Sequence, residues 1–152
     1  MIHTVTDPAD KRRIARLILE ALPEWFGIQE ARETYIRESA DEIMFASEQD
    51  GRPNGFLCLK ETGKDTVELA VMGVLKEYHR KGIGSALVEA AKAIAAEQGY
   101  SFLQVKTVQM GRYPEYDRTN RFYQSLGFRE FEVFPTLWDE RNPCQIYVMS
   151  LK

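Results

Sequence analysis

Apolar residues in the first part of the chain recur at spacings that predict a short strand followed by a helix. Residues 2–6 alternate weakly between apolar and polar side chains, as a short strand does. Asp7 and Pro8 then predict a helix start, because aspartate caps free backbone amides and proline suits the first helical position. Pro23 ends this helix, whose predicted buried face consists of Ile14, Leu17, Ile18, Ala21 and Leu22.

The middle of the chain predicts a second helix and an antiparallel meander. The helix is expected over residues 28–39, and Trp25 and Phe26 before it either join the core or line a cleft for an acceptor molecule. Dense turn residues at 50–55 and 62–64 separate three predicted strands, which span residues 42–49, 54–61 and 65–75.

The remaining residues return to helical spacing and then to strands. Residues 82–98 predict a long helix that Gly99 ends as a left-handed cap, and residues 102–108 predict a strand. Pro114 opens another helix, which Gly127 ends. Its predicted inner face consists of Thr119, Phe122, Tyr123 and Leu126. Two closing strands are expected over residues 128–133 and 146–151.

The order of these elements indicates a mixed sheet with helices on its faces. Strand 65–75, helix 82–98 and strand 102–108 should form a right-handed parallel crossover. Short turns join all the elements, without a linker, a repeat or a low-complexity tract. We therefore expect a single domain over residues 1–152.

Composition excludes several classes of protein. The net charge of −3, with basic residues scattered along the chain, argues against a nucleic-acid partner. The flanks of Cys58 and Cys144 look like strand interiors, so both should be buried, reduced thiols. With only His3 and His79 as histidines, no metal site is expected. No signal peptide or long apolar run is visible, which predicts a cytoplasmic protein without a membrane contact.

The residues best suited to bind a ligand lie where the strand that ends near Val74 meets the helix that begins at Gly82. The first turn of a helix has backbone amides without partners and carries partial positive charge. Glycines at 82 and 84 let this backbone approach a ligand closely, and Arg80 and Lys81 add full charges. The arrangement suits a pyrophosphate group.

Two common phosphate-binding motifs do not fit this turn. A dinucleotide fold would place a small residue where Leu87 stands, and an acidic residue near Lys106 and Thr107. The Gly-Lys-Ser/Thr sequence of a Walker loop is also absent. A strand-to-helix turn of this kind also carries glycines for structural reasons alone, so the turn by itself does not identify a ligand.

Two separated segments resemble one family. Residues 74–87 resemble the acetyl-CoA signature of the GNAT superfamily of N-acyltransferases, Gln/Arg-x-x-Gly-x-Gly/Ala, with His79 at the Gln/Arg position and Arg80 next to it as the expected source of charge. Residues 121–128 resemble the family's Phe-Tyr-x-x-x-Gly-Phe element. Chain length and element order agree, so the resemblance covers nearly the whole chain. It implies an α/β, GNAT-like fold with a central mixed, mostly antiparallel sheet of about seven strands and about four helices.

The resemblance also implies how acetyl-CoA would bind. The backbone of Met72, Gly73 and Val74 would run beside the pantetheine arm like an added strand, and Gly73 is compatible with a bulge that splays this strand. The pyrophosphate would be held by the turn and the first helical residues, namely His79, Arg80, Lys81, Gly82, Ile83 and Gly84, with Ser85 and Ala86 behind them.

Catalytic roles follow from the same resemblance. The amide of Val74 would stabilise the oxyanion, and Tyr123 would give a proton to the leaving thiolate unless it is only a core aromatic. Glu68 is the expected general base; the alternatives are a solvated charge at a strand edge and a relay of ordered waters.

The predicted function is transfer of an acetyl group from acetyl-CoA to a primary amine by direct attack in a ternary complex. The acceptor is a small molecule or a peptide, and its contacts are expected from residues 23–35 and 134–143. Asp139 and Glu140 either face a cationic acceptor or belong to a solvated loop. The alternatives are a non-catalytic acyl-CoA-binding sensor and a nucleotide-binding regulatory module. A homodimer is expected only by analogy with the family.

Overall fold

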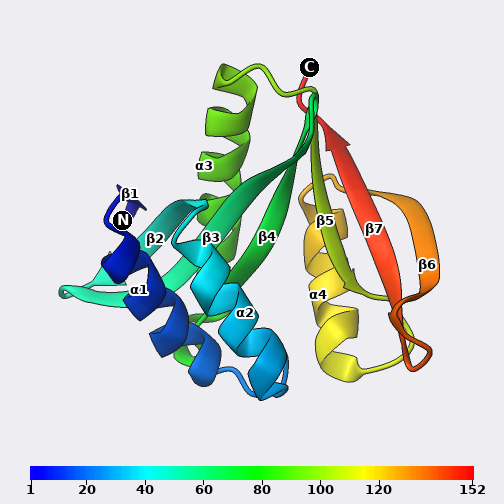
Figure 1. Cartoon of the computed structure of the whole chain (residues 1–152), viewed down its shortest axis with the longest axis horizontal. Coiled ribbons are helices and arrows are strands. Elements are labelled where there is room, and N and C mark those ends of the chain that lie inside the picture. Colours follow the sequence, from blue (N-terminus) through cyan, green and yellow to red (C-terminus); the bar gives the residue numbers. More distant parts are fainter. The chain divides into compact units, whose positions relative to one another are not determined.

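The computed structural model describes all of residues 1–152, which form four α-helices, one short 3₁₀-helix and seven strands (Figure 1). In chain order they are β1 (Ile2–Val5), α1 (Pro8–Glu20), α2 (Gln29–Ser39), β2 (Ile43–Gln49), β3 (Arg52–Gly63), β4 (Thr66–Val74), η1 (Lys76–Tyr78), α3 (Ile83–Glu97), β5 (Phe102–Val108), α4 (Pro114–Ser125), β6 (Arg129–Asp139) and β7 (Asn142–Ser150).

The strands form one seven-stranded sheet in the order β1-β2-β3-β4-β5-β7-β6. The pairs β1–β2, β2–β3, β5–β7 and β6–β7 are antiparallel. The predicted α/β fold with a mixed, seven-stranded sheet and four helices is confirmed. Two compact units make up the chain, residues 1–60 with 69–94 and residues 61–68 with 95–152, and each is described separately.

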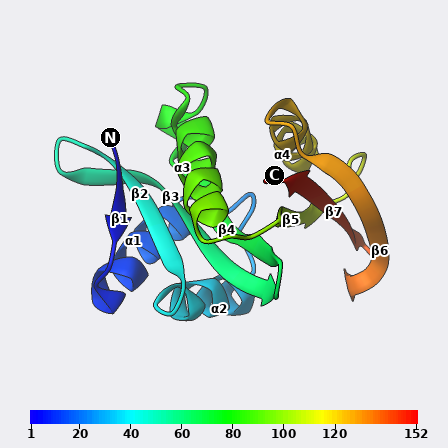
Figure 2. The same ribbon diagram turned by 90° about the horizontal axis from the view of Figure 1, so that it is seen from above.

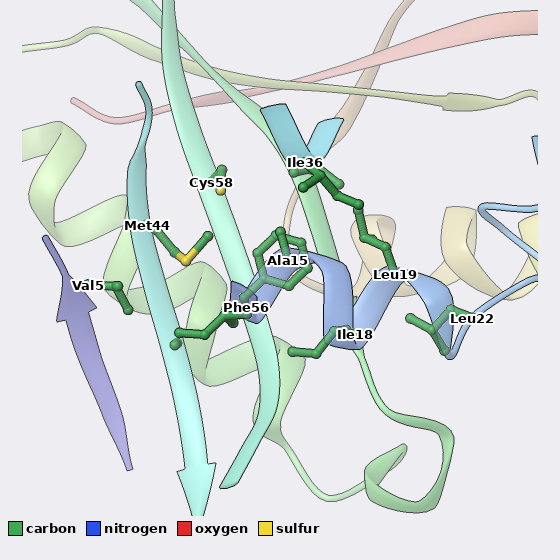
Figure 3. Packing of buried hydrophobic residues seen from close by; sticks show 12 residues of the cluster. Val5, Ala15, Ile18, Leu19, Leu22, Ile36, Met44, Phe56 and Cys58 are labelled. Carbon is green, nitrogen blue, oxygen red and sulfur yellow. The ribbon is translucent and has the colours of Figure 1, made fainter. Parts of the chain in front are cut away.

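The first unit buries both faces of its strands. Helices α1 and α2 cover one face and α3 covers the other (Figure 2). The core under α1 and α2 collects side chains from both helices and from β1, β2, β3 and β4 (Figure 3). Phe56, Met44 and Ile18 lie inside it without contact to solvent. This apolar contact fixes α1 against the end of β4, where the candidate site begins.

Helix α1 starts as predicted but faces the core with a different stripe. Asp7 caps it, since its Oδ2 accepts a hydrogen bond from the Asp10 amide at 3.0 Å. Leu17 is 43% exposed and Ala21 is exposed, so their predicted burial is wrong. The buried positions are Ile14, Ala15, Ile18, Leu19 and Leu22. The true stripe is rotated slightly around the helix and shares only three residues with the predicted one.

The β2–β3 hairpin has a tighter turn than the sequence predicted. Asp50 and Gly51 have φ angles of 54° and 77°, the left-handed conformation that a two-residue turn of type I′ requires. Gln49 pairs directly with Arg52, so the strands extend into the predicted turn. A bulge follows at Ser47 and Glu48, and it leaves Asn54 as the extra residue of β3. The carbonyl of Asn54 is thereby available, and it accepts a hydrogen bond from the Leu75 amide at 2.9 Å.

In the second unit, a buried polar network joins α4 to β5 and β7. The Tyr147 hydroxyl donates to Asn120 Oδ1 at 2.6 Å, and the Asn120 side-chain nitrogen donates to the carbonyls of Val108 and Tyr116 at 2.8 and 2.7 Å. Asn120 is fully buried, whereas three residues of the predicted inner face, Thr119, Phe122 and Leu126, are only half-buried. The sequence analysis missed Asn120, because a polar residue does not contribute to an apolar pattern.

The β6–β7 connection was predicted as a polar loop over residues 137–144, and this prediction is wrong. Strand β6 continues to Asp139 and β7 begins at Asn142, so only Glu140 and Arg141 form the turn. The Asp139 carboxylate accepts hydrogen bonds from the amides of Arg141 and Asn142 and from the Asn142 side chain, at 2.9 to 3.0 Å. These donors lower the pKa of Asp139. The Asp139 carboxylate therefore stabilises the turn between β6 and β7, a role that the sequence did not reveal.

Both cysteines are free and buried, as predicted. Burial raises the pKa of Cys144 to about 11 and raises that of Cys58 well above its ordinary value. Because the thiolate is the reactive form, a raised pKa means less thiolate at a given pH. We expect neither thiol to react with an aromatic disulfide reagent at pH 8 in the native protein, and both to react in guanidinium chloride. If one equivalent of thiol per chain reacted rapidly in the native protein, as measured by absorbance, this expectation would be wrong.

Candidate active site

The candidate site starts where β4 ends and the chain turns toward α3. After Val74, the 3₁₀-helix η1 is closed by hydrogen bonds from the amides of Tyr78 and His79 to the carbonyls of Leu75 and Lys76, at 2.9 and 3.1 Å. The His79 amide is thus used within the protein, although the sequence analysis placed it among the phosphate-binding amides. The polar turn predicted here is confirmed as a short, ordered connection.

Two residues of the next turn adopt the left-handed backbone conformation. Gly82 has a φ of 82° and Arg80 a φ of 64°. Glycine adopts this conformation readily, but for a residue with a side chain it costs about 1–2 kcal/mol. Strain of this kind in folded proteins is concentrated at ligand-binding sites and active sites. The strained Arg80 therefore supports the assignment of a site to this turn.

The N-terminus of α3 presents unpaired backbone amides. The first helical hydrogen bond runs from the Ala86 amide to the Gly82 carbonyl at 3.0 Å, so the Ala86 amide is occupied. The amides of Gly82, Ile83, Gly84 and Ser85 precede it and have no acceptor within the helix. Together with the helix dipole they create partial positive charge where the sequence predicted a pyrophosphate.

Two cations remain exposed beside this helix end. Arg80 and Lys81 are exposed, and Lys81 Nζ lies 5.6 Å from the centre of the Tyr78 ring. Lys76 forms an ion pair with Glu24, which lowers the pKa of that carboxyl group. Because the charge of Lys76 is paired with that of Glu24, the electrostatic attraction for an anion comes from Arg80 and Lys81.

Two glycines let the helices approach the strands that carry this turn. A Cβ atom on Gly73 would lie 3.0 Å from methyl groups of both Ile18 and Leu22, so α1 packs directly onto the end of β4. A Cβ atom on Gly55 in β3 would lie 3.1 Å from Ile83 Cγ2, at the start of α3. Met72 and Val74, on either side of Gly73, are half-buried. The predicted bulge at Gly73 stays a prediction.

Glu68 lies in β4 and is only 5% exposed, which excludes the alternative of a solvated edge charge. Its Oε1 accepts a hydrogen bond from Lys106 Nζ in β5 at 3.1 Å. Both charged groups act on the pKa of Cys144, so the three side chains lie near one another. The sequence did not reveal that Lys106 pairs with Glu68, because the two residues lie on different strands.

Tyr123 lies in α4 and is 6% exposed. Its ring contacts Phe128, with centroids 5.6 Å apart, and Tyr147, with centroids 6.3 Å apart. The neighbouring Phe122 ring lies at 5.5 Å. These aromatic contacts fix the orientation of the Tyr123 ring. A general acid and a core aromatic residue would both have such a fixed ring, so the contacts agree with either role.

A shallow hollow of about 410 Å³ opens along α2, in the segment predicted to contact the acceptor. It is lined by Ile28, Glu30, Ala31, Thr34 and Tyr35. Trp25 and Phe26 pack against the core, and the Trp25 and His79 rings meet edge to face with centroids 5.9 Å apart.

No group of three histidine, cysteine or carboxylate side chains is arranged as a metal-binding cluster. None of the helices combines the length and the apolar character needed to cross a membrane.

Comparison with known proteins places these features in a family. A family profile described as an acetyltransferase (GNAT) domain matches residues 40–130. An uncharacterised N-acetyltransferase of Chlorobaculum tepidum is 27% identical over 139 residues, which cover 90% of this chain and 82% of that protein.

Solved structures share the fold at low sequence identity. A GNAT-family acetyltransferase structure from Desulfovibrio desulfuricans has a TM-score of 0.88 at 17% identity, and the match covers 100% of this chain and 99% of the other. An aminoglycoside 6'-N-acetyltransferase complexed with coenzyme A has a TM-score of 0.76 at 19% identity, covering 100% and 97%. Because the family profile spans more than half of the chain, this protein belongs to the GNAT family of acetyltransferases.

Proposed function

We propose that this protein transfers the acetyl group of acetyl-CoA to a primary amine by direct attack in a ternary complex. The observation that carries the proposal is the N-terminus of α3. There, unpaired amides from Gly82 to Ser85, the strained Arg80 and the exposed Lys81 form an anion site directly after β4. The family match and the structural similarity to a CoA-bound acetyltransferase support acetyl-CoA as the anion.

In this proposal the end of β4 binds the rest of the cofactor. The backbone of Met72, Gly73 and Val74 runs along the pantetheine arm, and the Val74 amide donates a hydrogen bond to the oxyanion. The turn and the first residues of α3 hold the pyrophosphate, with the amides of Gly82 to Ser85 as donors. Arg80 and Lys81, both exposed, add full charges next to His79, which stands at the Gln/Arg position of the family signature.

The chemical step needs a base and an acid. An alkylamine has a pKa near 10 and is mostly protonated at neutral pH, so a proton must leave before the nitrogen can attack. We assign this step to Glu68, whose buried carboxylate is held by Lys106. The amine nitrogen then bonds to the acetyl carbon, the carbon–sulfur bond breaks, and Tyr123 gives its proton to the departing thiolate. The nitrogen passes its remaining excess proton to the tyrosinate, which leaves a neutral amide and restores Tyr123.

We assign acceptor contacts to residues 23–35, because all five residues that line the hollow along α2 belong to this segment. Glu30 in this hollow has the charge that an ammonium group requires, which favours a cationic small molecule or peptide. The similarity to an aminoglycoside acetyltransferase agrees with a polycationic acceptor, while its low identity leaves the choice of amine to experiment.

The test combines binding and turnover. At ten times its dissociation constant, acetyl-CoA should stabilise the native state by about 1.4 kcal/mol, and a thermal shift measures this. Free thiol should then appear when a panel of polyamines, aminoglycosides and peptides is added to the protein with acetyl-CoA. Absence of any thermal shift in the folded protein would contradict the proposal. Binding without thiol release for every amine would instead favour the non-catalytic acyl-CoA sensor.

A further inference from the structure

The peptide unit that joins Val74 to Leu75 is held by hydrogen bonds at both ends. His79 Nε2 lies 2.6 Å from the Val74 carbonyl oxygen, and the Leu75 amide donates to the Asn54 carbonyl at 2.9 Å. A carbonyl oxygen can only accept, so Nε2 must carry a proton in this contact.

Two further contacts hold His79 in place, one through its ring and one through its backbone. The Trp25 ring meets it edge-on, with centroids 5.9 Å apart and an angle of 74° between the planes. Its backbone amide donates to the carbonyl of Lys76, and Lys76 pairs with Glu24. The segment that follows α1 thus reaches the end of β4 through His79 and Lys76.

These contacts leave His79 poorly suited to bind phosphate. Its Nε2 is engaged by the Val74 carbonyl, so this nitrogen is not available to donate a hydrogen bond to an anion. The anion site next to it has the amides of α3 and the charges of Arg80 and Lys81, and it does not need the imidazole.

We propose that His79 is a positioning residue for acetyl transfer. It fixes the Val74 carbonyl, and since only φ and ψ separate the two peptide planes at a residue, it thereby limits the direction of the Val74 amide. That amide is the oxyanion donor in the proposed mechanism, so this inference rests on the proposed function. An oxyanion donor acts only at about 2.7–3.1 Å from the developing charge, which makes its direction decisive.

Two amide substitutions separate positioning from phosphate binding. In His79→Gln the side-chain nitrogen can reach the place of Nε2, whereas in His79→Asn it reaches only the place of Nδ1. We expect the asparagine variant to lose about tenfold in kcat, with the dissociation constant of CoA within about twofold, as a misdirected donor predicts. The glutamine variant should recover kcat to within about threefold. Weakened CoA binding with unchanged kcat, or a glutamine variant as slow as the asparagine variant, would overturn the proposal.

A second measurement does not depend on activity. Amide hydrogen exchange of the ligand-free protein should become about tenfold faster at Leu75 in the asparagine variant and stay unchanged in the glutamine variant. Exchange at Leu87, inside α3, is the internal reference and should not change. If the unaltered protein releases no CoA with any amine, the proposed function fails while this comparison still decides the role of His79. Equal protection of Leu75 in all three proteins would overturn the positioning role.

Discussion

Replacing Tyr123 with phenylalanine is expected to slow acetyl transfer about 100-fold and to leave the dissociation constant of CoA within about twofold. General acid catalysis by a positioned side chain contributes about 10²–10⁴ to a rate, and the lower figure suits a thiolate, which leaves without much help. Phenylalanine keeps the ring that packs against Phe128 and Tyr147, so the fold should be retained. The substitution removes the hydroxyl group, which is the proposed proton donor.

The measurement is the steady-state rate of CoA release with saturating acetyl-CoA and amine, together with CoA binding by calorimetry. Tyr100→Phe is the matched control, because it removes a hydroxyl that donates to Glu61 at 2.6 Å and has no part in the proposed chemistry. Its turnover should equal that of the unaltered protein. If Tyr123→Phe turns over within threefold of the unaltered rate, Tyr123 is a core aromatic and not the acid. A fall in affinity alone would give the hydroxyl a binding role.

The unpaired amides at the start of α3 could be predicted from the sequence because their determinants are contiguous. Gly82 marks a left-handed turn, and the helix that starts at Ile83 necessarily leaves its first amides unpaired. No distant residue is needed to create this donor set. The set of unpaired amides is smaller than the predicted one, since the amides of His79 and Ala86 donate to carbonyls of the protein.

The pairings between distant segments could not be predicted. Glu68 and Lys106 are 38 positions apart, and no periodicity of either strand indicates that they meet. The same applies to the His79 ring and Trp25. Each pair depends on how elements are brought together in three dimensions, and charge or aromatic character alone does not specify a partner. The positioning role of His79 was invisible for this reason.

The closing hairpin shows a different limit. Strand β6 is an edge strand with exposed side chains along most of its length, so it lacks the alternation that reveals a half-buried strand. Its residues are in a strand because they pair with β7, whose side chains are buried. Polar residues around Asp139 consequently looked like a loop. Strand pairing decides the structure of such a segment more than its own composition does.

Helix α1 was predicted with the right start, but it ends at Glu20 rather than just before Pro23, and its buried face is rotated. Ile14, Ile18 and Leu22 belong to both stripes, so the pattern alone fits either neighbouring face. The packing of the helix on the strands decides which of the two faces is buried. In the structure Ala15 and Leu19 are fully buried. An amphipathic pattern defines the apolar face of a helix. It does not show which of the leucines at the two edges of that face is buried, because this depends on the strands against which the helix packs.

Leu19 and Leu17 therefore provide the decisive pair of substitutions. Leu19→Ala is expected to lower the free energy of unfolding by about 3 kcal/mol, because removing a buried leucine side chain loses its burial and leaves a cavity. Leu17→Ala should change it by no more than about 0.5 kcal/mol, since its side chain is 43% exposed. Both variants gain the same helix propensity in the same helix, so their difference isolates burial in the core of Figure 3. Chemical denaturation measures both values, and equal losses would mean that α1 is rotated toward the stripe predicted from the sequence.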